Sequence, residues 1–388
     1  MKRFEVALGL AVLVSAAFLP TDVAPRQDVY YPPAGDAWEH RAPESVGLDS
    51  ALIAQAVEYA RTHDSRSVAY DFSGHEETFG ALLGPLPESR GGPAGVILRH
   101  GYIVAEWGDI ERPDLCFSAT KSLVSTMVGL AYDDGLIRSV QDPVGAYIDD
   151  GNFDSPHNRQ ITWEHLLQQT SEWEGMLFGQ SDTADLYHRR DREVGRQAPG
   201  TYYEYNDVRV NLASYSAMML FRRSLPEVLE ERLMDPIGAS DTWTWHGYGA
   251  SDVDVDGKTI NSVSGGGHWG GGLWISARDM ARFGYLFLRN GHWDGEQLIS
   301  AEWIALATTP SALRRNYGYM WWLEAEEDAP PGTPVTVFSA RGYGSNVIWI
   351  DKEHDLVAVL RWFGGSGREF FGPLVQAVQA KASVGSDR

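Results

Sequence analysis

The chain has 388 residues and a formal net charge of −21, from 32 basic and 53 acidic residues. Because a charge of this sign repels nucleic acid and anionic membranes, it excludes both as favoured partners. Hydrophobic residues (43%) and charged residues (22%) are balanced as in a soluble globular protein of one large domain or two interleaved ones.

Residues 1–19 have the pattern of a signal peptide. Lys2 and Arg3 precede an apolar run from Val6 to Leu19, which is short for a membrane span, and small residues near its end suit cleavage. We therefore expect export to the periplasm or the medium, with no stable membrane span after processing. The alternative is an apolar N-terminal helix that stays attached, in a cytoplasmic protein. Residues 20–40 indicate a linker or wrapping arm.

Hydrophobic periodicity and turn residues predict the elements that follow. In chain order we expect a helix over 49–63, a β-hairpin over 94–109, a helix from Ser118 to Gly135, helices over 162–170 and 209–223, a glycine-rich turn over 265–272, a helix over 276–291, strands over 318–324, 336–340, 346–351 and 356–363, and a helix over 369–383.

The spacing of these elements predicts an α/β chain of the α+β type. Successive C-terminal strands lie at hairpin distance, so the sheet should be antiparallel and flanked by helices. We expect one domain over 41–383. Its sheet region covers about 41–135 and 246–383, and a mainly helical insertion covers about 136–245.

Ser118 and Lys121 carry the first chemical signal. Residues three apart on a helix share a face, so the Lys121 amine can reach the Ser118 hydroxyl. A desolvated lysine can take the proton of a serine nucleophile, and the helix N-terminus favours negative charge there. Taken alone, the pair could equally be an N-cap serine with a surface lysine.

Two later stretches strengthen the signal. Residues 199–212 place Tyr205 beside Asn206 and Asp207 at the start of a helix, and a tyrosine can act as base or proton shuttle. Residues 338–351 place glycines after Arg341 at a strand edge. Backbone N–H groups there could form an oxyanion hole with the N–H of Ser118.

These stretches, in this order, resemble the penicillin-recognising serine hydrolases, a family that includes class C β-lactamases, D-alanyl-D-alanine carboxypeptidases, family VIII carboxylesterases and 6-aminohexanoate-dimer hydrolases. Residues 161–175 and 270–300 also resemble it. The resemblance implies a β-lactamase/transpeptidase-like fold. It makes Ser118 the acylated nucleophile, Lys121 its helix partner and Tyr205 the tyrosine of the Tyr-x-Asn element.

Asp207 departs from the family pattern, because many members have Asn at this position. A carboxylate near Lys121 would favour the charged ammonium, so Tyr205 would do more of the proton transfer. Alternatively, Asp207 turns away and caps a helix.

The third family element falls on Ala340, Arg341 and Gly342. Arg341 could bind a substrate carboxylate bidentately, or it could be an exposed strand-edge arginine. Gly342 would border the substrate, and the backbone N–H of Tyr343 would be the second oxyanion donor.

The remaining site candidates each have a structural alternative. Trp173 and Phe178 could be ring walls for acyl substrates or core residues. His268, in the glycine-rich turn, is favoured as structural over substrate-facing. Cys116, the single cysteine, indicates a packed side chain and excludes an internal disulfide. The 11 histidines show no metal-ligand spacing, and we expect neither a metal nor an organic cofactor.

We therefore predict a serine acyl hydrolase that forms an acyl-serine intermediate on small esters, amides or short peptides. The missing lysine of the family's Lys-Thr-Gly element favours an esterase or short-amide hydrolase. The alternatives are a β-lactamase or D-Ala-D-Ala peptidase and, in a different class, a non-catalytic binding or scaffold homologue.

Overall fold

The computed structural model describes residues 29–35, 37–75, 80–184, 196–324 and 330–385. The expected signal peptide, 1–19, and the first part of the 20–40 arm lie outside the described residues. Within those ranges, no helix combines the length and the hydrophobicity needed to cross a membrane. From residue 29 the arm runs along α7 (Ala277–Leu288), where the Arg282 guanidinium donates to the carbonyl oxygens of Pro33 at 2.7 Å and Gly35 at 2.9 Å.

A six-stranded sheet forms one half of the described fold, in the order β11-β12-β13-β14-β1-β2. Every neighbouring pair is antiparallel, as the hairpin spacing predicts. The strands are β1 (Ala94–Arg99), β2 (Tyr102–Trp107), β11 (Trp322–Leu323), β12 (Phe338–Gly342), β13 (Asn346–Asp351) and β14 (Leu356–Arg361).

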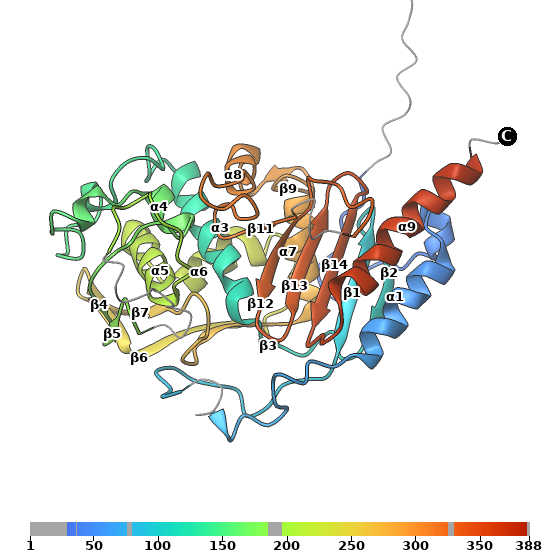
Figure 1. Cartoon of the computed structure of the whole chain (residues 1–388), viewed down its shortest axis with the longest axis horizontal. Helices are drawn as coiled ribbons and strands as arrows, with labels where there is room; N and C mark the ends of the chain where they lie inside the picture. Colours follow the sequence, from blue (N-terminus) through green and yellow to red (C-terminus); the bar gives the residue numbers. More distant parts are fainter. Residues whose placement is uncertain (1–28, 36, 76–79, 185–195, 325–329, 386–388) are drawn as a thin grey trace, which may run out of the picture.

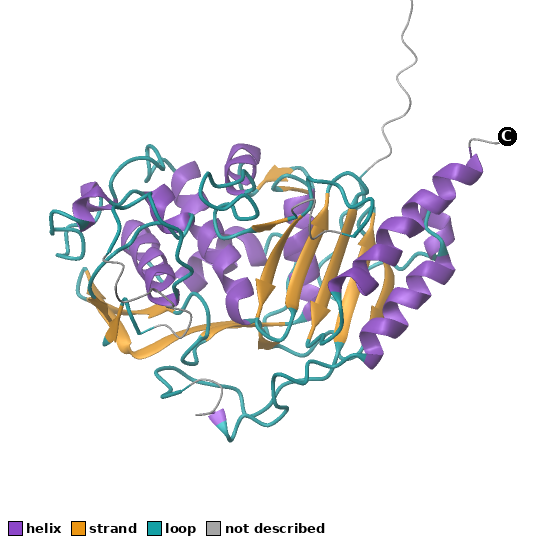
Figure 2. Cartoon of the chain, in the orientation of Figure 1, coloured by secondary structure: helices purple, strands orange, loops and turns teal. Residues whose placement is uncertain are grey.

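Helices cover both faces of this sheet (Figures 1 and 2). The terminal helices α1 (Ser50–Thr62) and α9 (Gly367–Gly385) pack together on one face, over residues such as Trp349 and Leu360. Helix α7 packs on the other face, against β13, β14 and β1. Alternation along each strand therefore buries both faces.

A second, four-stranded sheet, ordered β3-β8-β6-β7, borders the helical part of the chain. Its strands are β3 (Asp114–Leu115), β8 (Gly272–Ile275), β6 (Thr244–Val255) and β7 (Lys258–Val263). The remaining elements are η1 (Pro43–Val46), η2 (Phe117–Ala119), α3 (Thr120–Asp133), η3 (Val144–Ala146), η4 (Asn158–Gln160), α4 (Trp163–Leu167), β4 (Met176–Leu177), β5 (Gln180–Ser181), α5 (Asp207–Phe221), α6 (Leu225–Leu229), η5 (Glu230–Met234), β9 (His292–Trp293), β10 (Glu296–Gln297) and α8 (Ala301–Ala307).

Two predicted elements are shorter in the structure, and one observed hairpin was not predicted. The strand expected over 318–324 is limited to β11, because Met320 has φ of 59° and its N–H donates to the Leu167 carbonyl at 3.0 Å. The helix expected over 162–170 ends at Leu167, before the left-handed Gln169. The β6–β7 hairpin was not predicted.

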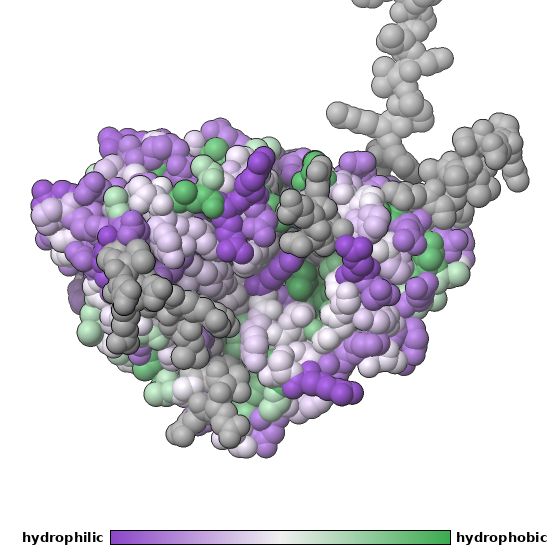
Figure 3. Space-filling view, in the orientation of Figure 1, coloured by the Kyte–Doolittle hydropathy of each residue, from purple (hydrophilic) through white to green (hydrophobic). Residues whose placement is uncertain are grey.

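The described surface is as polar as the composition leads one to expect. Hydrophilic residues cover most of the face shown in Figure 3, and hydrophobic residues lie scattered among them. The largest buried cluster extends from the α7 face of the six-stranded sheet through α3 and α5. Helix α3 thus connects the sheet to the helical part of the fold, and its first turn carries the predicted site.

Candidate active site

Ser118 lies in the turn that leads into α3. The preceding Phe117 has φ of 49°, a left-handed conformation that is costly for a bulky residue. Packing holds it there, because its ring meets the rings of Tyr343 and Trp362 edge-on, at 5.5 and 6.1 Å between centroids. The partly exposed Ser118 is thereby fixed at the start of the helix.

Cys116 holds the same turn against the strand β8. Its N–H donates to the Leu273 carbonyl in β8 at 2.9 Å, and its side chain is buried. Burial raises the pKa of the Cys116 thiol, so the thiol stays protonated at neutral pH. The structure therefore places Cys116 as a packed side chain.

Lys121 reaches the Ser118 hydroxyl. Its Nζ donates to Ser118 Oγ at 2.9 Å, although Lys121 is only 1% exposed. The same Nζ forms a buried ion pair with Asp207, the first residue of α5. The carboxylate does not cap α5, because the Asn206 side chain accepts the Arg209 N–H instead. Asp207 is therefore turned towards the lysine.

Tyr205 meets the same lysine from the loop before α5. Lys121 Nζ lies 4.8 Å from the centroid of the Tyr205 ring, within the range of a cation–π contact. Ser118, Lys121, Tyr205 and Asp207 thus gather around one ammonium group, although they come from segments far apart in the sequence.

The glycine-rich turn closes over this ion pair. A Cβ on Gly266 would lie 2.7 Å from Asp207 Oδ1 and 2.7 Å from Lys121 Nζ, so only glycine allows this approach. His268 Nδ1 lies 3.7 Å from Asp207 Oδ2. Burial lowers the pKa of His268, and Lys121 lowers it further, while Asp207 opposes both effects. His268 is therefore neutral at neutral pH.

This pKa shift predicts a pH-dependent contribution of His268 to stability. Below pH 6.5, the ordinary pKa of histidine, the unfolded chain takes up a proton that folded His268 does not. The unfolding free energy of the wild type minus that of His268→Asn should stay level above this pH. Below it, the difference should fall by up to about 1.4 kcal/mol per pH unit. Urea unfolding from pH 5 to 8 measures it, and parallel curves would contradict the neutral state of His268.

The end of β12 lies against the Ser118 turn. A Cβ on Gly342 would lie 2.0 Å from the Cys116 carbonyl oxygen and 3.1 Å from the Ala119 nitrogen. The Tyr343 ring packs on Phe117, and its hydroxyl donates to the Ser67 carbonyl at 2.8 Å. The structure therefore brings the Gly342–Tyr343 backbone to the turn that holds Ser118.

The Arg341 side chain projects from the face of the six-stranded sheet that α1 and α9 cover, because successive residues of a strand point to opposite faces. Its cross-strand partner Val347 packs in the α1–α9 layer. The guanidinium pairs with Glu324 and donates from Nε to Ser339 Oγ at 2.7 Å. Arg341 borders a pocket of about 550 Å³ with Gly342. A substrate carboxylate would have to displace Glu324 to bind it there.

Trp173 packs in the core of the described fold. Only 1% of its surface is exposed, and its indole donates to the Asn152 carbonyl at 2.8 Å. A side chain buried to this extent offers no surface to an acyl group, so the core alternative holds for Trp173 and its predicted substrate contact is corrected. Phe178 packs against the same core, edge-on to Tyr215.

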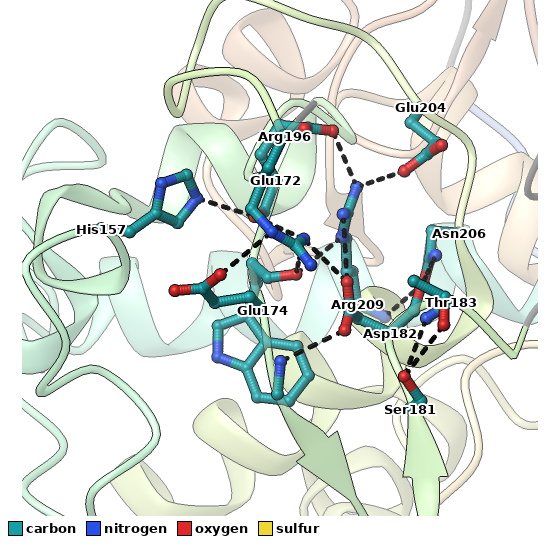
Figure 4. Close-up of polar contacts among 12 residues, drawn as sticks. His157, Glu172, Glu174, Ser181, Asp182, Thr183, Arg196, Glu204, Asn206 and Arg209 are labelled. Atoms are coloured by element: carbon teal, nitrogen blue, oxygen red, sulfur yellow. Dashed lines mark hydrogen bonds and ion pairs between the residues drawn. The ribbon is translucent and has the colours of Figure 1, made fainter. Parts of the chain in front are cut away.

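A buried ionic network that sequence reasoning missed supports Tyr205 (Figure 4). Arg209, on α5, is 1% exposed and pairs with Glu204 at 2.8 Å and Glu172 at 3.2 Å. Arg196 pairs with Asp182 at 2.7 Å beside them. In the described part of the chain, no group of three or more His, Cys, Asp or Glu side chains could hold a metal ion.

The network fixes the residues on both sides of Tyr205. The Glu204 N–H donates to the Gln169 carbonyl at 2.9 Å, and the Asn206 N–H donates to Gln169 Oε1 at 3.1 Å. The Asn206 amide also donates to the Asp182 carbonyl at 2.7 Å. One signal could have revealed the network: a charged residue, Arg209, stands within the apolar run of α5.

Removing the central cation should destabilise the protein strongly. Arg209→Met leaves buried carboxylates without their partner, which costs about 3–5 kcal/mol. Arg223→Met is the matched control, because Arg223 and its partner Glu231 are both exposed and such a pair contributes at most about 1 kcal/mol. Denaturant unfolding of both variants measures the difference, and equal losses would argue against a structural role of the network.

One family model matches more than half of the chain. The family model described as Beta-lactamase matches residues 113–367. An uncharacterized protein of Alkalihalophilus pseudofirmus is 23% identical over 274 residues, which cover 62% of this chain and 71% of the relative.

Solved structures show the same fold. A protein assigned as a 6-aminohexanoate-dimer hydrolase from Bacillus anthracis matches with a TM-score of 0.56 and 16% identity, over 93% of this chain and 91% of that one. A family VIII carboxylesterase matches with a TM-score of 0.56 and 16% identity, over 86% and 99%. A D-stereospecific amidohydrolase from Streptomyces matches with a TM-score of 0.54 and 17% identity, over 83% and 97%. At these identities the likeness is one of fold, which is β-lactamase/transpeptidase-like.

Proposed function

The chain belongs to the Beta-lactamase family, and on this basis we propose that it is a serine acyl hydrolase acting through a covalent acyl-Ser118 intermediate. Its substrates would be esters or amides of small molecules or short peptides. The observation that carries the proposal is the 2.9 Å hydrogen bond from Lys121 Nζ to Ser118 Oγ, with the Tyr205 ring against the same ammonium.

In acylation, Ser118 Oγ attacks the carbonyl carbon of the substrate. Lys121 Nζ, which is paired with Asp207, orients Ser118 by donating to Oγ. Tyr205 relays the hydroxyl proton: its phenol gives a proton to the leaving oxygen or nitrogen as it receives the one from Ser118. The bond to the leaving group breaks, and the acyl group stays on Oγ.

The backbone supplies the oxyanion donors in this proposal. The N–H groups of Ser118 and Tyr343 would donate to the carbonyl oxygen as it becomes negative. The support for this role is the contact of Gly342 with the Cys116–Ala119 turn. Water then adds to the acyl carbon, the carboxylic acid leaves, and the proton returns to Ser118.

Ser118→Ala should abolish this activity. We expect hydrolysis of 4-nitrophenyl acetate to fall at least about a thousandfold, because no other group replaces the nucleophile. A fluorophosphonate probe should label the wild type at Ser118. Ser125→Ala is the matched control, since this buried serine lies on α3, the helix that follows Ser118, and its hydroxyl has no hydrogen-bond partner among the described residues. Failure of the wild type to label would favour the non-catalytic binding homologue.

A β-lactamase is the second candidate, and β12 argues against an efficient one. Its Arg341 takes a position near that of the family's strand lysine and is already paired with Glu324. We therefore expect nitrocefin to be hydrolysed at least about tenfold more slowly than 4-nitrophenyl acetate, on the basis of kcat/KM. Rapid nitrocefin turnover without esterase activity would reverse this assignment.

A further inference from the structure

Aromatic rings continue the site beyond Tyr205. The Tyr205 ring lies 6.1 Å from Trp322, on the edge strand β11, and 6.4 Å from Tyr317. Tyr317 in turn meets Trp322 at 5.0 Å and Tyr203 at 5.6 Å, all between centroids. Tyr317 is fully buried, whereas Trp322 and Tyr203 are partly exposed. These rings form a platform next to the proposed proton relay.

Arg314 lies on this platform. Its guanidinium carbon is 4.6 Å from the Tyr203 ring centroid and 5.4 Å from that of Trp322. Its Nε donates to Asn316 Oδ1 at 3.0 Å, which fixes the plane of the group. Within the described ranges, Arg314 has no ion pair, and its terminal amino groups make no hydrogen bond, unlike those of Arg341 with Glu324.

The charge of Arg314 is not neutralised by its ring partner. Burial raises the pKa of Tyr203 to about 12, although Arg314 and Lys121 both act to lower it. Tyr203 is therefore a neutral phenol at neutral pH. An arginine that is held on two rings, and whose terminal amino groups pair with no described residue, is a suitable receptor for a planar anion such as a carboxylate.

We propose that Arg314 is a specificity-determining residue that binds a carboxylate on the leaving-group half of the substrate. This rests on the proposed function, in which Tyr205 gives its proton to the leaving group. The leaving group must then lie next to Tyr205, and Trp322 connects Tyr205 to Arg314 through ring contacts. The apolar part of the leaving group would then lie on the Trp322 ring. Tyr202 and Leu313, the residues that precede Tyr203 and Arg314 in the sequence, are exposed.

Two acetyl esters test the proposal directly. One is 3-(4-acetoxyphenyl)propanoate, whose leaving phenol carries a carboxylate, and the other is its neutral methyl ester. Both give the same acetyl-enzyme, so a difference in kcat/KM reports the leaving-group side alone. We expect the wild type to prefer the carboxylate about tenfold or more, as a charge-assisted bidentate contact requires.

The variants assign this preference to one arginine. Arg314→Gln should bring the ratio of the two kcat/KM values close to one, and Arg314→Lys should restore part of it, because the charge returns without the planar fork. Arg315→Gln, at the exposed neighbour, should keep the wild-type ratio.

The opposite outcomes overturn the proposal. An unchanged ratio in Arg314→Gln would contradict it, and so would a ratio lost in Arg341→Gln instead, which would put the carboxylate in the pocket beside Gly342. Failure of the proposed function is distinguishable, because an enzyme without Ser118 chemistry would hydrolyse neither ester and would not label with fluorophosphonate.

Discussion

The buried ion pair of Lys121 and Asp207 is the interaction on which the site depends. Both side chains are almost inaccessible, at 2% and 4% exposure, so each charge has given up its hydration. Their attraction offsets this cost only with further partners, and the Ser118 hydroxyl and the Tyr205 ring are those partners. The pair also joins α3 to α5 across 86 residues of sequence, so it couples the helical part of the fold to the nucleophile.

Two close backbone approaches shape the site around this pair. Gly266 covers it from the glycine-rich turn, and Gly342 presses the end of β12 against the Ser118 turn. In both places a Cβ would collide with the site, so the sequence must supply glycine. The burial of Lys121 and Asp207 strengthens their electrostatic interaction, whereas Ser118 and Tyr205 remain partly exposed.

Local geometry made part of this arrangement predictable. The Ser118–Lys121 contact follows from helical spacing, and the antiparallel sheet follows from hairpin distances. The β6–β7 hairpin was missed despite its Asp256-Gly257 turn, a strong hairpin signal, because the flanking residues do not alternate cleanly. The surroundings of Arg341 could not be read either, since the face of a strand residue is set by its pairing with a distant strand. The two alternatives for Trp173, ring wall or core residue, could not be separated for a related reason: burial depends on contacts that only the folded chain makes.

The distribution of carboxylates decides which arginine remains available for a ligand. Glu324 follows Trp322 by two residues, but it turns to Arg341 on β12 and leaves Arg314 without a counter-ion in the described part of the chain. A substrate carboxylate that binds Arg341 must first break a charge-assisted contact, whereas one that binds Arg314 displaces no carboxylate of the described residues. Arg314 and Arg341 carry the same charge but differ in their availability to a ligand. The edge strand β11 sets this difference, because its Trp322 ring holds Arg314 and the residue that follows the strand, Glu324, pairs with Arg341.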